Sequence, residues 1–315
     1  MSIQALENIL LIVLSSIVLI KAVETFSKSA SCLAKHFDIS SYTISFVLVA
    51  LATSLPEVLV GVESALKGTQ ELSFGNAIGS NIALLSLVPA VVLLFAKKVS
   101  SRRVFSTKDI YFAIIFSCLT LGLAYDNLVS RIDALILLAC YLIYTVAFLE
   151  KSSLSEKVLE KLHHKDLLKQ VTLFVISLLV LVTASEFIVR SSLGISQSLG
   201  ISIAFVGLTL TAVGTSLPEI VFSIKAVEEH DDSSVMGNLI GSVIVNSTVV
   251  IAITALVNPI TIINSVAMLN SGLFALLAMI VFFIFSDSQK NINRFEALVL
   301  LVIYIGFIAR QFFIN

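Results

Sequence analysis

Long apolar stretches separated by short polar segments run through almost the whole chain. A bilayer core about 30 Å thick needs roughly 20 apolar residues for each crossing helix. Read with that window, the pattern predicts ten membrane helices, over 5–26, 40–66, 72–96, 108–125, 132–149, 168–190, 201–227, 234–257, 265–285 and 294–313. The expected fold class is therefore an all-α polytopic membrane protein with ten transmembrane helices.

Composition excludes several other classes of protein. Of the 315 residues, 57% are hydrophobic and 13% are charged, whereas soluble domains carry about 25% charged residues. A soluble enzyme, a nucleic-acid binder and a disordered chain are therefore excluded. The first apolar segment has no basic region before it and no small-residue cleavage site, so we interpret it as a membrane helix and not as a signal peptide. Membrane lipids are the expected surroundings, and neither an obligate protein partner nor a cofactor is evident.

The longest polar stretch, 150–170, suits either a surface-lying amphipathic helix or a solvated linker. Lys and Arg are much more frequent in the loops on the side of this stretch than in the other loops. The positive-inside rule then places the 150–170 linker in the cytoplasm and both termini outside, in a cell membrane.

The sequence contains an internal repeat. The segment ALATSLPE at 50–57 recurs as AVGTSLPE at 212–219, and GNAIGS at 75–80 recurs as GNLIGS at 237–242, both at an interval of 162 residues. Each copy holds five predicted helices, and because five is odd, the second copy enters the membrane from the opposite side. We expect two inverted repeats, 1–149 with its motif at 50–84 and 168–315 with its motif at 212–246, joined by the linker 150–167.

The repeated motifs carry polar groups that a bilayer normally excludes. Glu57 and Glu219 lie inside apolar spans, where a carboxylate is expensive and the default interpretation is functional. A threonine and a serine precede each glutamate by four and three positions, which places them on the same helical face. The prolines remove a backbone donor, and the glycines permit close backbone approach. We expect broken or loosened helices around Pro56, Gly75, Asn76, Gly79, Pro218, Gly237, Asn238 and Gly241, with the asparagines capping or bridging them.

These groups offer carboxylate, hydroxyl and carbonyl oxygens without nitrogen or sulfur ligands, a set that hard cations such as Na⁺ and Ca²⁺ prefer. Glu57 and Glu219 are the candidate metal ligands. An intramembrane enzyme is disfavoured because the spans hold no nucleophile–base pair and no metal-binding histidine cluster. A passive channel is disfavoured because paired broken helices with midplane carboxylates suit a closed, alternating site.

At these motifs the sequence resembles the cation/Ca²⁺ exchanger superfamily, in particular its prokaryotic ten-helix Na⁺/Ca²⁺ exchangers. The resemblance implies antiport of Ca²⁺ against Na⁺ by alternating access, with two long helices sliding past an ion-binding core. Both cations would bind transiently as cargo. Carried over by position, the ion-binding residues would be Thr53, Ser54, Glu57, Ser80, Thr215, Ser216, Glu219 and Ser242, with backbone contacts near Ala50 and Ala212.

The chain departs from the family pattern at the centre of the site. Four residues after the last serine of each glycine motif, where the family usually has a polar or acidic side chain, this chain has Leu84 and Asn246. Asn246 brings an oxygen without a charge, and Leu84 brings none. We therefore expect fewer coupled cations per Ca²⁺. The alternative is exchange of Ca²⁺, or of another divalent cation such as Mn²⁺, against H⁺, in which Glu57 or Glu219 would carry the proton.

Overall fold

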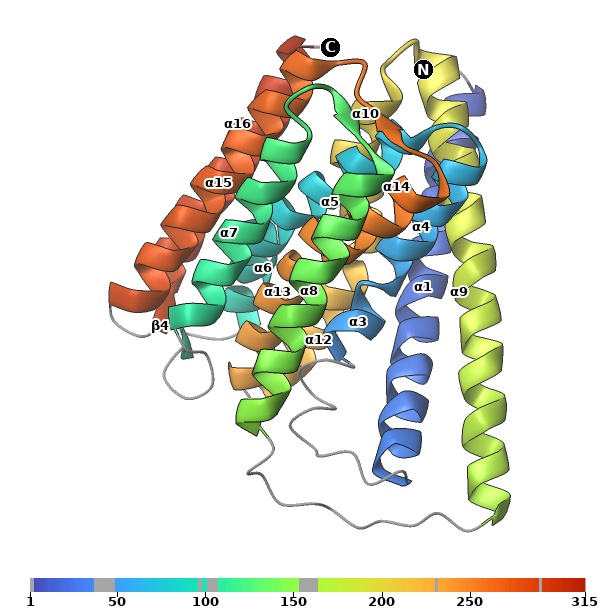
Figure 1. The fold of residues 1–315 in the computed structure, drawn as a ribbon, viewed down its shortest axis with the longest axis vertical. Helices are drawn as coiled ribbons and strands as arrows, with labels where there is room; N and C mark the ends of the chain where they lie inside the picture. The colour runs from blue at the N-terminus through green and yellow to red at the C-terminus, as the bar shows by residue number, and fades with distance from the viewer. Residues whose placement is uncertain are drawn as a thin grey trace.

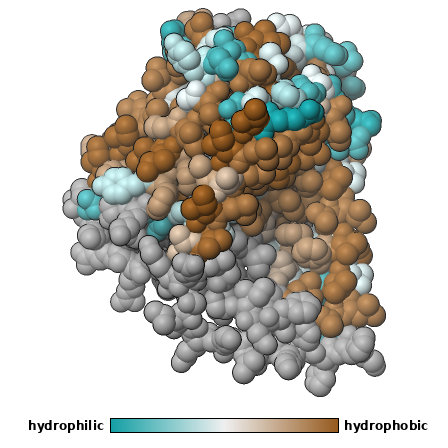
Figure 2. All heavy atoms as spheres, viewed as in Figure 1, coloured by the Kyte–Doolittle hydropathy of each residue, from teal (hydrophilic) through white to brown (hydrophobic). Residues whose placement is uncertain are grey.

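The computed structural model describes residues 3–36, 49–95, 98–100, 107–152, 164–229, 232–288 and 291–314. Seven helices within these residues are long and apolar enough to cross a membrane. Apolar side chains cover most of the described surface in Figure 2, and polar side chains gather at its upper end. The chain is thus a helical, multi-pass membrane protein. Most of the segment expected to form a surface helix or linker, residues 153–163, lies outside the described residues.

The first half of the chain consists of α1 (Ile3–His36), α3 (Val49–Thr53), α4 (Leu55–Leu66), α5 (Gln70–Leu85), α6 (Leu87–Phe95), α7 (Thr107–Leu123) and α8 (Arg131–Ser152). The second half begins with α9 (His164–Leu199), α10 (Ile203–Val206), the π-helix η2 (Gly207–Thr211), α11 (Ala212–Thr215) and α12 (Leu217–Glu228). It continues with α13 (Asp232–Val245), the π-helix η3 (Asn246–Val250), α14 (Ile251–Val257), α15 (Ser265–Ser288) and α16 (Arg294–Ile314). Several predicted spans therefore consist of two or more shorter helices in succession.

Two helices are much longer than a bilayer requires. α1 has 34 residues and α9 has 36, and the two run side by side along one flank of the molecule (Figure 1). Only 28% of the apolar window of α9 is buried, against 83% in the segment that runs from α13 to α14. The segments that carry the repeated motifs therefore form the interior, while α1 and α9 present most of their surface to lipid.

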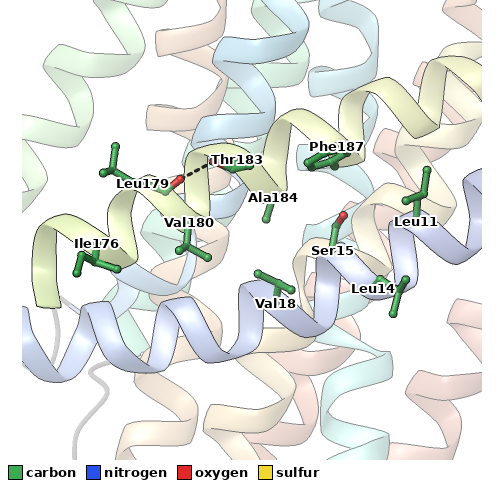
Figure 3. A pocket seen from close by; sticks show the side chains of 10 residues that line it. All are labelled: Leu11, Leu14, Ser15, Val18, Ile176, Leu179, Val180, Thr183, Ala184 and Phe187. Carbon is green, nitrogen blue, oxygen red and sulfur yellow. Dashed lines mark hydrogen bonds between the residues drawn. The ribbon is translucent and has the colours of Figure 1, made fainter.

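A groove of about 440 Å³ lies between α1 and α9 (Figure 3). Its lining is almost wholly apolar and includes Val18, Leu179 and Phe187, which are partly exposed. None of its lining residues belongs to the repeated motifs, so the groove is a feature of the lipid-facing surface and not of the interior.

Short antiparallel strands join the two halves at two places. β1 (Lys98–Ser100) pairs with β4 (Asn291–Asn293), and β2 (Leu128–Val129) pairs with β3 (Ile260–Thr261). Each pair joins one strand from the first half to one from the second. The two halves are therefore interlocked and do not stand side by side as separate units.

Two arginines reinforce this interlock in equivalent ways. Arg294, at the start of α16, donates from Nε to the carbonyl oxygen of Leu93 near the end of α6, at 3.0 Å. Arg131, at the start of α8, donates from Nε to the carbonyl oxygen of Leu256 near the end of α14, at 3.2 Å. Cations near helix C-termini satisfy carbonyls that have no partner within the helix. Each half thus caps a helix that belongs to the other.

Candidate ion-binding site

Two membrane segments are interrupted at equivalent places, one in each repeat. α3 ends at Thr53, and Ser54 adopts φ −81° and ψ 3° before α4 begins at Leu55. α11 ends at Thr215, and Ser216 adopts φ −83° and ψ 0° before α12 begins. A proline stands in the first turn of each following helix, where its missing N–H is tolerated although the preceding helix cannot continue its hydrogen-bond ladder. Near-identical backbone angles result from the same local sequence.

Each break is followed at once by a glutamate. Glu57 lies in the first turn of α4 and Glu219 in the first turn of α12, and both side chains are fully buried. The N-terminus of a helix carries the positive end of the helix dipole and stabilises a nearby negative charge. The broken helices therefore place both carboxylates at positions that favour anions, inside the protein.

Several buried oxygens here have no hydrogen-bond partner among the described residues. They are one oxygen of Glu57 (Oε2), both carboxylate oxygens of Glu219, and the hydroxyls of Ser54 and Ser216. Burying a charged carboxylate without a partner is costly, so a compensating positive charge is expected. Carboxylate and hydroxyl oxygens are ligands of hard cations, and the residues present fit such a cation.

Ser80 brings the two repeats together at the carboxylate of Glu57. From α5, its hydroxyl donates to Oε1 of Glu57 at 3.4 Å. The same hydroxyl lies 3.5 Å from the hydroxyl of Thr215 and 3.5 Å from the carbonyl oxygen of Ala212, both on α11. A carboxylate of the first repeat and polar atoms of the second repeat therefore surround one serine.

The threonines of the broken helices each contact the opposite repeat. Thr53 donates to Oδ1 of Asn238 on α13 at 2.9 Å, and its hydroxyl lies 3.4 Å from that of Ser242. Thr215 donates to Oδ1 of Asn76 on α5 at 3.2 Å. The two bonds are equivalent under the repeat. Both asparagines thus anchor a broken helix, each across the boundary between repeats.

The two positions expected at the centre of the site differ between the repeats. Leu84 is fully buried on α5 and packs within an apolar cluster. Asn246, its equivalent, is also fully buried, but neither polar atom of its side chain has a hydrogen-bond partner among the described residues. It is the first residue of the π-helix η3. π-helical turns are rare and are frequent at functional sites.

One sequence expectation is wrong. The glycine motifs at 75–80 and 237–242 do not break or loosen their helices, because α5 and α13 are continuous through them. Close approach is the role of the first motif: a Cβ on Gly75 would lie 2.7 Å from the carbonyl oxygen of Ala204, and one on Gly79 would overlap Leu208. α5 stays intact because isolated glycines are tolerated within a helix. The backbone of the neighbouring segment fills the space that their side chains would take.

The remaining predicted side chains are all buried in this region: Thr53, Ser54, Ser80, Thr215, Ser216 and Ser242. Ala50 lies in α3 and Ala212 in α11, each in the last helical turn before a break.

Sequence reasoning missed two groups of contacts. Asn81 and Ser247, each directly after a candidate ligand, join Ser117 and Thr120 in a buried polar cluster. The signal was the polarity of these residues within otherwise apolar segments. Glu24 pairs with Lys225 of α12, in addition to its neighbours on α1; the two residues lie far apart in sequence, and no local pattern connects them.

Comparison with known proteins identifies relatives over nearly the whole chain. A family model described as sodium/calcium exchanger protein matches residues 7–150 and 169–313. The sodium/calcium exchanger MaX1 of Methanosarcina acetivorans is 26% identical over 351 aligned positions, which cover 98% of this chain and 99% of that protein.

Solved structures of exchangers also match nearly the whole chain. A structure of the sodium-calcium exchanger NCX_Mj, soaked with Na⁺ and Sr²⁺, matches with a TM-score of 0.69 and 27% identity, covering 98% of this chain and 99% of that one. The H⁺/Ca²⁺ exchanger CAX matches with a TM-score of 0.76 and 19% identity, covering 98% of this chain and 87% of that one. The second likeness concerns the fold alone.

Proposed function

Because the chain belongs to the sodium/calcium exchanger protein family, we propose that it exchanges Ca²⁺ for Na⁺ across the membrane by alternating access. Membership makes it a cation antiporter and not an enzyme. The observation that carries the proposal is the pair of fully buried carboxylates, Glu57 and Glu219, three of whose four oxygens have no hydrogen-bond donor among the described residues. Such oxygens suit a dehydrated cation as their partner.

The proposed ligands come from both repeats and from four membrane segments. The two carboxylates together carry a charge of −2 when ionised, which one Ca²⁺ or two Na⁺ neutralise. The two cations therefore compete for the same oxygens, and this competition is the basis of exchange. The ligand set is Thr53, Ser54, Glu57, Ser80, Thr215, Ser216, Glu219, Ser242 and Asn246, with the backbone near Ala50 and Ala212.

The topology belongs to the same proposal. Ten membrane crossings arranged as two inverted repeats, 1–149 and 168–315, place the two proline breaks at opposing positions around one site. The equivalent backbone angles at Ser54 and Ser216 support this arrangement. The distribution of Lys and Arg supports external termini and a cytoplasmic linker at 150–167.

A specific feature favours one alternative, exchange of Ca²⁺ or another divalent cation against H⁺. Leu84 offers no oxygen at the centre and Asn246 offers no charge, so the centre has fewer groups for extra Na⁺ ions than the family pattern provides. In that version Glu57 or Glu219 binds the proton that replaces a cation. The experiment below separates the two driving ions.

The test is ⁴⁵Ca²⁺ uptake into vesicles that contain the purified protein. We expect uptake when vesicles loaded with Na⁺ are diluted into Na⁺-free buffer, and none when a pH gradient replaces the Na⁺ gradient. Uptake driven by the pH gradient alone would establish the alternative. Glu57→Gln and Glu219→Gln keep the side-chain shape and remove the charge, so each should reduce uptake to background.

Glu186→Gln is the matched control for these variants. Glu186 is a partly exposed carboxylate on α9 that pairs with Arg190 on its own helix. Its loss should leave uptake close to that of the unaltered protein, since surface ion pairs contribute little. Full activity in Glu57→Gln or Glu219→Gln would refute the assignment of the site.

A further inference from the structure

A second buried polar cluster lies next to the candidate site. The side chain of Asn81 on α5 donates from Nδ2 to the hydroxyl of Ser247 at 2.8 Å, and the hydroxyl of Ser117 on α7 lies 2.9 Å from the same oxygen. The single hydroxyl proton of Thr120 on α7 is shared between the carbonyl oxygens of Ser247 and of Phe116 on its own helix. Asn81, Ser117, Thr120 and Ser247 are all buried. We call them the Ser247 cluster; they tie both the side chain and the backbone of Ser247 to neighbouring helices.

The cluster adjoins the proposed ligands on two helices at once. Asn81 directly follows Ser80 on α5, and Ser247 directly follows Asn246 in η3. Neighbouring residues of a helix point about 100° apart. The cluster therefore lies one step around each helix from a proposed ligand, and α7, which carries none of the proposed ligands, gains contact with the back of the site.

The other repeat shows that the fold does not need polar groups here. The positions equivalent to Asn81, Ser247 and Asn246 are all apolar and buried in one hydrophobic cluster: Val243, Leu85 and Leu84. The same architecture thus packs with aliphatic side chains at the equivalent place. Burying hydroxyls and amides is less favourable than burying aliphatic groups, so a purely structural role does not account for the polar cluster.

The hydrogen bonds of the Ser247 cluster converge where the backbone changes from an α-helix to a π-helix. η3 begins at Asn246, and the carbonyl that Thr120 binds is that of the second residue of this π-helix. The Asn246 side chain has no hydrogen-bond partner among the described residues. The backbone of η3, which the Ser247 cluster contacts, therefore sets the position of its Cα atom and the direction of its Cα–Cβ bond.

We propose that Ser117 and Thr120 are positioning residues that act through Ser247 to hold the carboxamide oxygen of Asn246 toward the transported cation, and so raise the affinity for Ca²⁺. A carboxamide presents an oxygen or an NH₂ group to the site, depending on its orientation, and only the oxygen binds a cation. Because the backbone is fixed, the neutral side chain of Asn246 can supply a ligand oxygen in a site that has no third carboxylate. This inference rests on the proposed function, because it takes Asn246 as a ligand.

The experiment measures Ca²⁺ binding to the purified full-length protein by isothermal titration calorimetry. Thr120→Val keeps the side-chain shape but removes the donor to Ser247, and we expect the Kd for Ca²⁺ to rise roughly threefold to tenfold, as for one lost hydrogen bond. Thr120→Ser keeps the donor and should rescue the affinity. Thr248→Val is the matched control, because the buried Thr248 hydroxyl donates to Ile244 of the same segment; it should bind Ca²⁺ as the unaltered protein does.

A double-mutant cycle with Asn246→Ala distinguishes positioning from general loosening of the protein. If Thr120 acts through Asn246, Thr120→Val causes no further loss of Ca²⁺ affinity in the Asn246→Ala background. Additive losses, or an unchanged Kd in Thr120→Val alone, overturn the inference. Ser117→Ala carries the same expectations in both backgrounds and decides the question if Thr120→Val does not fold.

The same titrations separate this inference from the proposed function. If Glu219→Gln abolishes Ca²⁺ binding while Thr120→Val and Ser117→Ala bind normally, only the positioning role is overturned. If the unaltered protein binds no Ca²⁺, the proposed function is overturned, and the positioning role with it.

Discussion

The hydroxyl of Thr53 donates a hydrogen bond to the side-chain oxygen of Asn238 at 2.9 Å, although the two residues are 185 positions apart. Its equivalent joins Thr215 to Asn76. Each bond fixes the end of a half-helix from one repeat to a continuous helix of the other. The two breaks are therefore held by reciprocal contacts, and each repeat supplies part of the support for the other's carboxylate.

We expect Asn238→Ala and Asn76→Ala to weaken Ca²⁺ affinity by similar factors, because the lost bonds are equivalent. A typical net hydrogen bond of about 1 kcal/mol corresponds to roughly fivefold in Kd. Calorimetric titration of the two variants measures this. A large loss in one variant and none in the other would show that the reciprocal bonds are not functionally equivalent.

Ca²⁺ should stabilise the protein against unfolding. A ligand at about 100 times its Kd that binds only the folded state adds about 2.7 kcal/mol to the free energy of unfolding. In the Glu57→Gln, Glu219→Gln double variant this Ca²⁺-dependent gain should vanish. The cation-free double variant should also unfold at a higher temperature than the cation-free unaltered protein. The reason is that neutral amides replace two buried carboxylates, three of whose four oxygens have no hydrogen-bond donor among the described residues. Thermal unfolding with Ca²⁺ and with a chelator tests both expectations.

Adding a charge at the centre should change the coupling ratio. In the proposed site, Leu84→Asp adds a third carboxylate to those of Glu57 and Glu219, so a third positive charge is needed for neutrality. We expect the number of Na⁺ ions exchanged per Ca²⁺ to rise, and reversal potentials of reconstituted transport measure it. Leu84→Met is the control, since it conserves volume without adding charge. An unaltered ratio in Leu84→Asp would show that this position does not face the cations.

Gly79→Ala should destabilise the protein by about 1–3 kcal/mol, the usual cost of overpacking, because the added methyl group would overlap the backbone of Leu208. Gly122→Ala is a matched control within a helix, since nothing lies within 4 Å of its added Cβ. There alanine should be neutral, or should stabilise by up to about 1 kcal/mol through its higher helix propensity. Comparison of thermal unfolding midpoints decides whether close approach is what the glycine motif requires.

The ion pair between Glu24 of α1 and Lys225 of α12 should influence how readily α1 moves relative to α12. Lys225→Glu places two acidic groups together and should weaken the contact between these helices, while the exchanged pair Glu24→Lys, Lys225→Glu should restore it. Cysteine cross-linking between α1 and α12 reports the contact. Because the pair is partly exposed, the effect on stability should be within about 1 kcal/mol.

Local sequence determines part of this structure and not the rest. The proline motifs stand at both helix breaks because proline acts on its own backbone and on the carbonyl four residues before it. The glycines of the first motif do not break α5, because an isolated glycine leaves a helix intact and the backbone of another segment packs against it. That packing is not visible in the local sequence. The π-helix that begins at Asn246 receives hydrogen bonds from α7, and the Glu24–Lys225 pair joins two helices that are far apart in sequence. Neither has a signature within one segment.

The interlocked caps have a consequence for how the chain is made. Carbonyl oxygens at the end of α6 remain without the Arg294 donor until nearly the last helix has left the ribosome, because that arginine opens α16. The first strand pair is completed at the same moment, by residues just ahead of it. A chain cut before β4 lacks both this cap and the β1–β4 strand pair, so we expect it to be less stable than a chain cut within α16, which keeps both.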